Sequence, residues 1–303
     1  MFISIGYVII DDIVLPDGTT HMGCLGGGSV HAIMGMRVWS DQVGLVAKIG
    51  TNFPAGLKKE LHSIFDMRGV SILNKKTMRA WQNFDADGTR TETFRSDPAD
   101  FPLYKPLLED FPAVYDSLQG VHLHCSCDEV VGWVERLRPL GNPFILWEPL
   151  QAEGLVEFRP GFFKALPLVD CVSPNLQEAQ SLLDLNDPHD LLDAIINKGA
   201  KQVVIRAGAA GSIYADSKGV SIQVPAVRVE KIIDQTGAGN AYCGGLVVGS
   251  VLSQVDPRDA LCRAAVSASF ALEQFGALFP MERLKEKADS RFGICKEELN
   301  NMN

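Results

Sequence analysis

The sequence predicts a three-layer α/β/α sandwich with a mostly parallel central sheet and a small β lid. From residue 43 onward, short and nearly continuous apolar runs alternate with segments of helical length. One stretch, "TMRAWQNFDADGTRTETFR", breaks this alternation with two β-rich arms around a turn at Asp85–Gly88. We therefore expect a single domain over residues 1–303, with a lid formed by roughly residues 11–25 and 74–97.

The first element is the apolar segment "MFISIGYVII", which Asp11 and Asp12 follow at once. It lacks a basic amino-terminal region, so we expect a first buried strand and not a signal peptide. Further buried strands are predicted at "QVGLVAKIG", "VHLHC", "FILWEP", "VDCVSPN" and "QVVIRAG". Helices are predicted between them, at "AGLKKELHSIFDMRG", "DEVVGWVERLRPLG" and "DPHDLLDAIINKGA".

The last third of the chain begins with a hairpin pattern, "GSIYADSKGVSIQVPA", and is helical after it. The segment "DPRDALCRAAVSASFALEQFGA" has an Asp-Pro cap at its start and Gly276 at its end, so we expect a helix between these two signals.

Composition excludes several classes of protein. The formal net charge is −9, whereas binding to a nucleic-acid backbone needs a basic face. No window holds 18 uninterrupted apolar residues, so a membrane span is not expected. Seven cysteines, an odd number in a long chain, fit a reducing compartment better than a disulfide framework. We expect a cytoplasmic protein that binds neither nucleic acid nor membrane.

The segment "HLHCSCDE" brings two histidines and two cysteines together in the sequence. Along a strand His122 and His124 share one face, and Cys125 and Cys127 share the other. The four ligands would therefore not converge on one metal ion, and we interpret the segment as an ordinary strand end.

The segment "DQTGAGNAYCGGLVVGSVL" is a glycine-rich turn that leads directly into a helix. Gly237 and Gly239 allow backbone angles that other residues avoid. Successive N–H groups then point at one place at a helix N-terminus, where the helix dipole favours an anion. This predicts an anion hole that binds phosphate through the amides of Ala238 and Gly239. Gly244 and Gly245 would let the helix pack closely against the sheet.

The same segment resembles the signature of the PfkB/ribokinase family of sugar and nucleoside kinases, Asp-x-Thr-Gly-Ala-Gly-Asp followed by Gly-Gly. Four further motifs are similar to those of the family and follow its order over some 240 residues: "GYVIIDD", "GGGSVHAI" with "VGLVAKIGTNFPAG", "SPNLQEAQSLL" and "VVIRAGAAGSIY". The fungal Mak-type subgroup of PfkB-like proteins looks similar, because it carries asparagine at the position of Asn240. The lid is also a feature of the family.

The resemblance implies a role for each group of motif residues. Asn240 and the loop residues Gly237, Ala238 and Gly239 would act on the transferred phosphoryl group. The small-molecule acceptor would meet Asp11, Gly27 and His31. ATP would lie beside Arg206, Gly208, Gly211, Asp234 and Thr236. Magnesium and its waters would be held by Asn175 and Glu178.

Each role has an ordinary structural alternative. Asn175 and Glu178 could form a capping box at a helix start. Asp11 could be a turn residue, and Arg206 could belong to a surface ion pair. The joint occurrence of the motifs favours the functional interpretation.

Three positions depart from the family pattern. The family's catalytic aspartate is Asn240, the asparagine of its second motif is His31, and its Asp-x-Asn-x-Arg segment is "WEPLQAE", with Glu148 as the acid and Leu150 in place of the asparagine. Acceptor recognition is therefore expected to be unusual.

Asn240 admits three explanations: an engineered change, a natural pseudokinase, or an enzyme that works without this carboxylate. The other two departures favour natural divergence. His31, if it titrates near neutral pH, could replace the missing base.

We expect ATP- and magnesium-dependent phosphoryl transfer to a hydroxyl of a small metabolite, and we expect Asn240→Asp to accelerate it if the chain is a slow kinase. The alternatives are a catalytically silent binding or regulatory protein, and a different reaction on a nucleoside-like or phosphorylated substrate. The hairpin is predicted to cover the acceptor, with Trp81 or Phe84 packing on it. A homodimer through the lid is compatible with this role.

Overall fold

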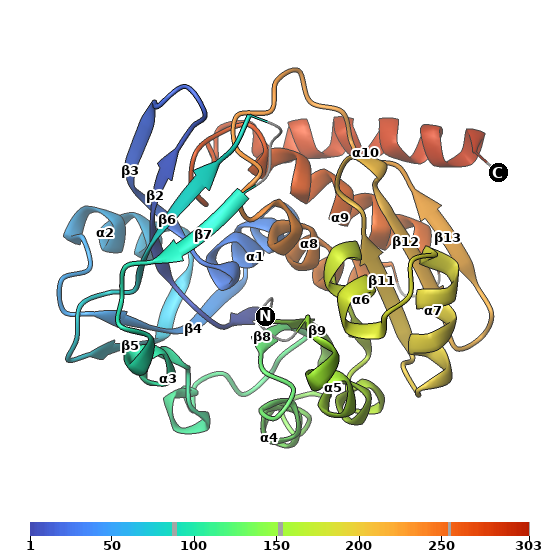
Figure 1. Ribbon diagram of the computed structural model, residues 1–303, viewed down its shortest axis with the longest axis horizontal. Helices are drawn as coiled ribbons and strands as arrows, with labels where there is room; N and C mark the ends of the chain where they lie inside the picture. The colour runs from blue at the N-terminus through green and yellow to red at the C-terminus, as the bar shows by residue number, and fades with distance from the viewer. Residues whose placement is uncertain (87–89, 151–153, 254–255, 303) are drawn as a thin grey trace.

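Figure 1 shows the computed structural model, which describes residues 1–86, 90–150, 154–253 and 256–302. Its described strands form a nine-stranded sheet in the order β13-β12-β11-β10-β9-β8-β1-β4-β5. The strands are β1 (Phe2–Ile5), β4 (Val43–Gly50), β5 (Asp66–Leu73), β8 (Gly120–Cys125), β9 (Phe144–Pro149), β10 (Cys171–Val172), β11 (Gln202–Arg206), β12 (Ser212–Asp216) and β13 (Ser221–Val224).

The large sheet is parallel from β5 to β11 and antiparallel at β12 and β13. This confirms the predicted mostly parallel sheet and the hairpin at its edge. The reason lies in the connections, because helical crossovers return the chain in the same direction while a tight turn reverses it.

Helices cover both faces of the large sheet and complete the three layers (Figure 1). One hydrophobic core lies under α1 (Gly28–Arg37), α2 (Ala55–Ile64), α8 (Ala238–Leu252), α9 (Pro257–Ala271) and α10 (Leu284–Asn301). A second core lies on the other face, under α4 (Val130–Leu137), α5 (Arg159–Ala165), α6 (Leu176–Leu183) and α7 (Pro188–Asn197). The short α3 (Phe101–Tyr104) follows the small sheet.

The second sheet has four strands in the order β3-β2-β6-β7: β2 (Ile9–Val14), β3 (Thr20–Gly26), β6 (Arg79–Phe84) and β7 (Arg90–Phe94). β6 and β7 pair antiparallel, as the hairpin pattern predicts. The predicted turn residues Asp87 and Gly88 lie outside the described residues. In Figure 1 this small sheet projects from the body beside α1 and β4.

The prediction of one first strand was wrong. The segment divides at Gly6–Val8, so that β1 lies in the large sheet and β2 in the small one. The start of α1 explains the division: Ser29 Oγ donates to the carbonyl oxygen of Tyr7 at 2.6 Å, and Gly27 packs against the same carbonyl. These contacts draw the chain out of the large sheet.

Two expectations about the last helices are also corrected. α9 begins at its Asp256 cap but ends at Ala271, because the carbonyl oxygen of Leu272 accepts from Ile233 N at 2.7 Å. Gly244 and Gly245 do permit close packing, but against the backbone of α1 and against Ser267 of α9, not against the sheet. Among the described helices, none combines the length and the apolar character that a membrane span requires.

Candidate active site

The carboxyl ends of neighbouring strands meet the N-terminus of α8 at one edge of the large sheet. His124 comes near the end of β8, Glu148 near the end of β9 and Arg206 at the end of β11. Parallel α/β sheets bind their ligands at this edge. The candidate site is therefore built where sequence motifs far apart in the chain converge.

The anion loop has the backbone geometry that its glycines predict. Asp234 Oδ1 accepts from Thr236 N at 2.8 Å, which closes the turn before the helix. Gly237 caps α8 with φ 74, a left-handed conformation in which a side chain would also strike the ring of His31. The second carboxylate oxygen of Asp234 and the hydroxyl of Thr236 are buried without a partner among the described residues.

Two amides of the loop are available to an anion, and they differ from the expected pair by one residue. Ala238 N donates to Gln235 O at 3.3 Å, and Ala241 N donates to Gly237 O at 2.9 Å. The N–H groups of Gly239 and Asn240, in the same first turn, have no backbone partner among the described residues. The unpaired donors lie where the helix dipole is positive.

The side chain of Asn240 is already engaged in the structure. Its Nδ2 donates to Glu148 Oε2 at 2.9 Å. A carboxylate only accepts hydrogen bonds, so the amide must present its nitrogen to Glu148 and keep its Oδ1 for another donor. Asn240 is thus fixed in one orientation by a residue 92 positions away.

Glu148 collects three donors although only 3% of it is exposed. Besides Asn240, it is bound by Arg206 Nη1 at 2.6 Å and by His122 Nε2 at 2.8 Å. His122 is bound in turn by Ser4 Oγ at 2.9 Å, which fixes the ring. Burial alone would raise the pKa of Glu148, but Arg206 and His122 hold it well below its usual range. Glu148 is therefore a permanent negative charge.

Arg206 carries the positive charge beside the anion loop. Its side chain is 11% exposed and donates to Ser173 O at 2.9 Å, so the surface ion pair considered as its alternative is excluded. Its guanidinium lies directly against Gly239, where a Cβ would strike Nη1. Its Nε is buried without a partner in the described structure. A guanidinium at this position suits a phosphate better than any neutral ligand.

Asn175 and Glu178 form the capping box that was the alternative to magnesium binding. Asn175 Oδ1 accepts from Glu178 N at 2.8 Å, and Glu178 Oε2 accepts from Asn175 N at 2.9 Å. Burial raises the pKa of Glu178, while Arg206, 3.9 Å away, lowers it. A buried carboxylate with a raised pKa gains from a nearby cation. The cap and a magnesium role for Glu178 are thus compatible.

The turn after β11 brings the remaining nucleotide residues beside this edge. Gly208 has φ 57 and begins a single 3₁₀ turn, Gly208–Ala210, and Gly211, with φ 86, follows it. A Cβ on Gly211 would strike the carbonyl oxygen of Val224, whereas Gly208 has open space around it. Only Gly211 is therefore required by packing as well as by backbone angle.

Asp11 lies in a buried position on the small sheet, in β2 and not in a turn. Gln82 Nε2 donates to Asp11 Oδ1 at 2.9 Å, and Gly26 leaves room for the other oxygen. Burial raises the pKa of Asp11 to about 7. A carboxyl of this kind can both donate to and accept from a hydroxyl near neutral pH.

Two histidines lie close to the start of α8. A Cβ on Gly237 would strike the ring of His31, and a Cβ on Gly28 would approach both His124 Nδ1 and Asn240 Nδ2. Both ring nitrogens of His31 and Nδ1 of His124 are buried without a partner in the described part of the chain. Burial lowers the pKa of each ring to about 4. The expectation that His31 titrates near neutral pH was therefore wrong, because its burial keeps it uncharged.

Comparisons with known proteins show to which family the chain belongs. A model of the pfkB family carbohydrate kinase matches residues 116–284, more than half of the chain. The chain belongs to the PfkB family. Among curated relatives of this PfkB-family chain, the cytidine kinase of Thermococcus kodakarensis is 28% identical over 253 residues, covering 82% of this chain and 87% of the relative. Protein MAK32 of Saccharomyces cerevisiae is 24% identical over 311 residues, covering 91% of this chain and 85% of the relative.

Solved structures show the same fold. A nucleoside kinase of Methanocaldococcus jannaschii, described as an archaeal member of the ribokinase family, has a TM-score of 0.73 at 18% identity and covers 95% of this chain and 98% of that one. A nucleoside kinase of Burkholderia thailandensis in complex with inosine has a TM-score of 0.75 at 17% identity, over 97% of each chain. The ribokinase-like fold of the PfkB family is thereby established.

Sequence reasoning placed His122 and His124 on one face of a strand, and their stacked rings, 6.0 Å apart, confirm it. It did not foresee that this face belongs to the site of the PfkB chain. It also missed Gln82. The signal for Gln82 was the period-two alternation of β2 and β6, which places it on the face of Asp11. The signal for His124 was its place near the end of a predicted strand, which puts it at the same sheet edge as Glu148.

Trp81 cannot pack on an acceptor at Asp11. Side chains alternate along β6, so Trp81 lies on the opposite face of the small sheet. There it stacks under Arg95, whose guanidinium carbon is 4.9 Å from the ring centroid. Asp12 binds Arg95 and Arg79 on the same face. Phe84 shares the face of Asp11, and its packing on an acceptor stays a prediction.

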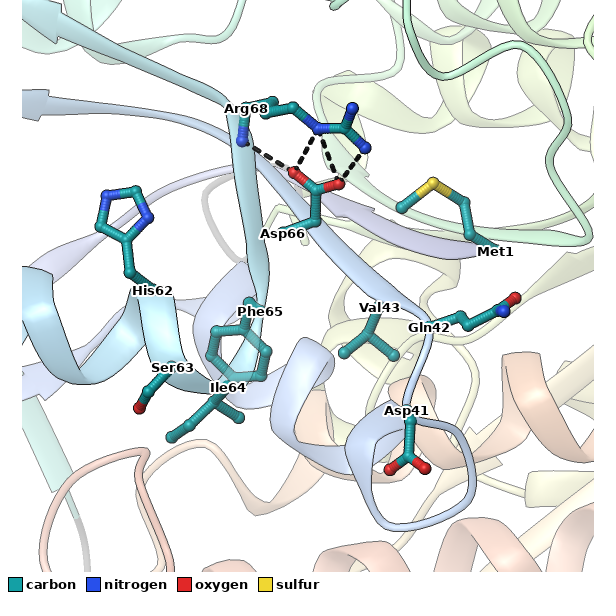
Figure 2. Close-up of a pocket in the computed structure, with 10 residues that line it drawn as sticks. All are labelled: Met1, Asp41, Gln42, Val43, His62, Ser63, Ile64, Phe65, Asp66 and Arg68. Carbon is teal, nitrogen blue, oxygen red and sulfur yellow. Dashed lines mark hydrogen bonds and ion pairs between the residues drawn. The ribbon is translucent and has the colours of Figure 1, made fainter.

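A separate cavity of about 380 Å³ lies at the opposite edge of the large sheet (Figure 2). Met1, Val43 and Phe65 place it at the amino ends of β1, β4 and β5. In Figure 2 the described Asp66 and Arg68 side chains bind each other beside it. Because none of the predicted site residues lines it, this cavity is not the candidate site.

Proposed function

We propose that this PfkB-family protein transfers the γ-phosphoryl group of ATP to a hydroxyl of a nucleoside or sugar. One observation carries the proposal: the unpaired amides of Gly239 and Asn240 lie beside the Arg206 guanidinium at a helix N-terminus. An anion held there would lie close to His31, which packs against Gly237, and to His124, which packs with Asn240 against Gly28. A phosphoryl group and a hydroxyl could then meet in one place.

The chain's own residues would act mainly by position and charge, which suffices for much of the catalysis of phosphoryl transfer. The two amides and Arg206 would stabilise negative charge on the transferred group. Asp11 would bind an acceptor hydroxyl, next to Gly27. Asn240 would orient the attacking hydroxyl through Oδ1.

Magnesium, when bound with ATP, would supply positive charge to the β- and γ-phosphates. Glu178 is the residue that would hold it or its waters, because its carboxylate is partly buried near the end of β11. Asn175 would keep Glu178 in place through the capping box. Gly208 and Gly211 would shape the turn beside ATP, and Asp234 and Thr236 would shape the loop.

The order of acceptors to test follows from the relatives. The cytidine kinase is matched over most of both chains, and a structural neighbour holds inosine. The small sheet would cover the acceptor with the face that carries Asp11, Gln82 and Phe84. Pairing of the edge strands β3 or β7 between two copies would form a homodimer.

A silent binding protein is the second candidate, and the Asn240–Glu148 hydrogen bond favours it. The residue at the position of the family's base is committed to a structural contact. Such a protein would bind ATP or ADP and a nucleoside without turnover. A different reaction on a nucleoside-like substrate is the third candidate.

The experiment has two stages. Thermal shifts with ATP or ADP, with and without Mg²⁺, test nucleotide binding. Transfer of labelled γ-phosphate to cytidine, adenosine, inosine, ribose and fructose then tests the reaction. Binding without transfer to any acceptor would identify a silent protein, and no nucleotide shift would refute the proposed site.

A further inference from the structure

We propose that His124 accepts the proton of the attacking hydroxyl, in place of the carboxylate that is absent at position 240. This inference rests on the proposed phosphoryl transfer. It divides the work of one aspartate between two residues, with Asn240 orienting the hydroxyl and His124 receiving its proton.

The first support is the shared position of the two side chains. A methyl group on Gly28 would lie 2.5 Å from His124 Nδ1 and 2.9 Å from Asn240 Nδ2. Both side chains therefore pack against the same point at the start of α1. Gly28 allows them to come this close because it has no side chain.

The second support is the unused capacity of His124. Its Nδ1 is buried and has no hydrogen-bond partner among the described residues. An unpaired buried polar atom is costly, which is a reason to expect a ligand group there. The carbonyl end of Asn240 cannot take a proton at neutral pH. Glu148 is already bound by Asn240, Arg206 and His122, so we assign the proton to the imidazole of His124.

The surroundings of His124 keep its ring neutral before the reaction, and one of its charged neighbours would stabilise the protonated ring. Burial is the largest influence and keeps the ring neutral before reaction, with its pKa lowered to about 4. Glu148 raises the pKa and would stabilise an imidazolium, whereas His122 and Arg206 lower it. The remaining ring in contact, Tyr7, meets His124 edge-on with centroids 6.4 Å apart.

His31 is the competing histidine, and its position is less suitable. Its ring lies against Gly237, and a Cβ added at that glycine would overlap the ring. Among the charged neighbours of His31, Arg90 has the larger effect and lowers its pKa, whereas Glu148 has the smaller effect and raises it. An imidazolium at His31 would therefore lie beside a positive charge, whereas one at His124 would have Glu148 as its principal charged neighbour.

In the transfer step, the hydroxyl oxygen of the acceptor forms a bond to the γ-phosphorus of ATP. The bond from that phosphorus to the β–γ bridging oxygen breaks, and its electron pair leaves with ADP. The hydroxyl proton passes to Nδ1 of His124, which later returns it to solvent.

The decisive measurement does not need turnover. The ring-nitrogen shifts of ¹⁵N-histidine-labelled protein at pH 7 report which nitrogen carries the proton, and His124→Asn assigns the signal by its loss. We expect an unprotonated Nδ1. A protonated Nδ1 would overturn the proposal, because that atom could not then accept the hydroxyl proton.

Turnover supplies the second test, with cytidine as the first acceptor and the others of the panel after it. His124→Asn should lower kcat by about 10²–10⁴-fold while the ADP thermal shift stays unchanged. Added imidazole should restore part of the rate to His124→Ala. His62→Asn, in α2 at the far edge of the sheet, is the matched control and should keep full activity.

The two failures can be told apart. A wild-type protein that phosphorylates no acceptor refutes the proposed function, and the nitrogen shifts still decide whether Nδ1 could accept a proton. A working kinase whose His124→Asn variant retains its rate, or whose His124→Ala variant gains nothing from imidazole, refutes this inference alone.

Discussion

Asn240 donates its side-chain amide to Glu148 across a distance of 2.9 Å, and Glu148 is at the same time bound by Arg206 and His122. Position 240 is therefore part of a closed hydrogen-bond network around one buried negative charge. A second carboxylate at this position would face the first. The sequence-based expectation that Asn240→Asp accelerates transfer needs revision for this reason.

Asn240→Asp alone should give no gain in kcat at pH 7, and the variant should lose about 1.5–3 kcal/mol of unfolding free energy. Two carboxylates in one buried site cannot both ionise freely, so one of them would hold a proton. Urea unfolding and transfer of labelled phosphate measure the two effects. A faster single variant would contradict this interpretation of the network.

The paired variant Asn240→Asp with Glu148→Gln is the control for that experiment. It keeps one negative charge beside Arg206 and gives the new aspartate an amide donor. We expect it to recover most of the lost stability and to exceed the single variant in kcat. Equal behaviour of the single and paired variants would mean that Glu148 and residue 240 are not coupled.

Gly239→Ala should abolish the thermal shift by ADP and cost about 1–3 kcal/mol of stability. The added methyl would strike the guanidinium of Arg206 and displace it from the loop. Gly293→Ala in α10 is the matched control, since no atom lies within 4 Å of its new Cβ. That control should keep the shift and gain about 0.5–1 kcal/mol. A full ADP shift in Gly239→Ala would exclude the anion loop as the phosphate site.

Asp11→Asn should change how stability depends on pH. The pKa of Asp11 is about 7 in the folded protein against an ordinary value of 3.8, so folding favours its protonated form. Its contribution is complete below pH 4 and is lost as the pH rises towards 7 and beyond. The variant should therefore be more stable than wild type at pH 8, by about 2–4 kcal/mol, and equal to it at pH 4. Chemical denaturation at both pH values measures this, and a difference that does not grow with pH would show that Asp11 is ionised at pH 7 in the fold.

Glu178→Gln should remove the part of the ADP thermal shift that depends on Mg²⁺ and keep the part seen in EDTA. The amide preserves the acceptor oxygen of the capping box but not the charge that a cation needs. The control is Asp187→Asn, which makes the same change at the cap of α7. If both variants respond to Mg²⁺ as wild type does, Glu178 has no metal role.

Much of the fold could be predicted because each pattern has one physical cause. The apolar runs at β8, β9 and β11 are buried on both sides, and such runs are typical of parallel strands. The division of the first apolar segment could not be predicted in the same way. It depends on contacts of Tyr7 with Gly27 and Ser29, some twenty residues later.

The site shows the same boundary between local and distant information. The loop glycines and the capping box of Asn175 follow from local sequence, and both are present. The partner of Asn240 does not follow from local sequence. Glu148 meets Asn240 only when β9 has paired with β8 and the start of α8 lies at the end of β9. Burial, which sets the pKa of Asp11 and His31, is likewise a property of the assembled layers.

β1 lies in the interior of the large sheet, between β4 and β8, and this affects how the protein folds during synthesis. β1 (Phe2–Ile5) is synthesised before both of its neighbours, β4 and β8, and β8 ends only at Cys125. At about 5–20 residues per second, roughly 6–25 s pass before the second neighbour is synthesised. During that time the nascent chain exposes an apolar strand with an unpaired edge, which is a substrate for chaperones and a risk for aggregation. Translation must then continue through α8 before Asn240 can meet Glu148, so no amino-terminal fragment carries a finished site.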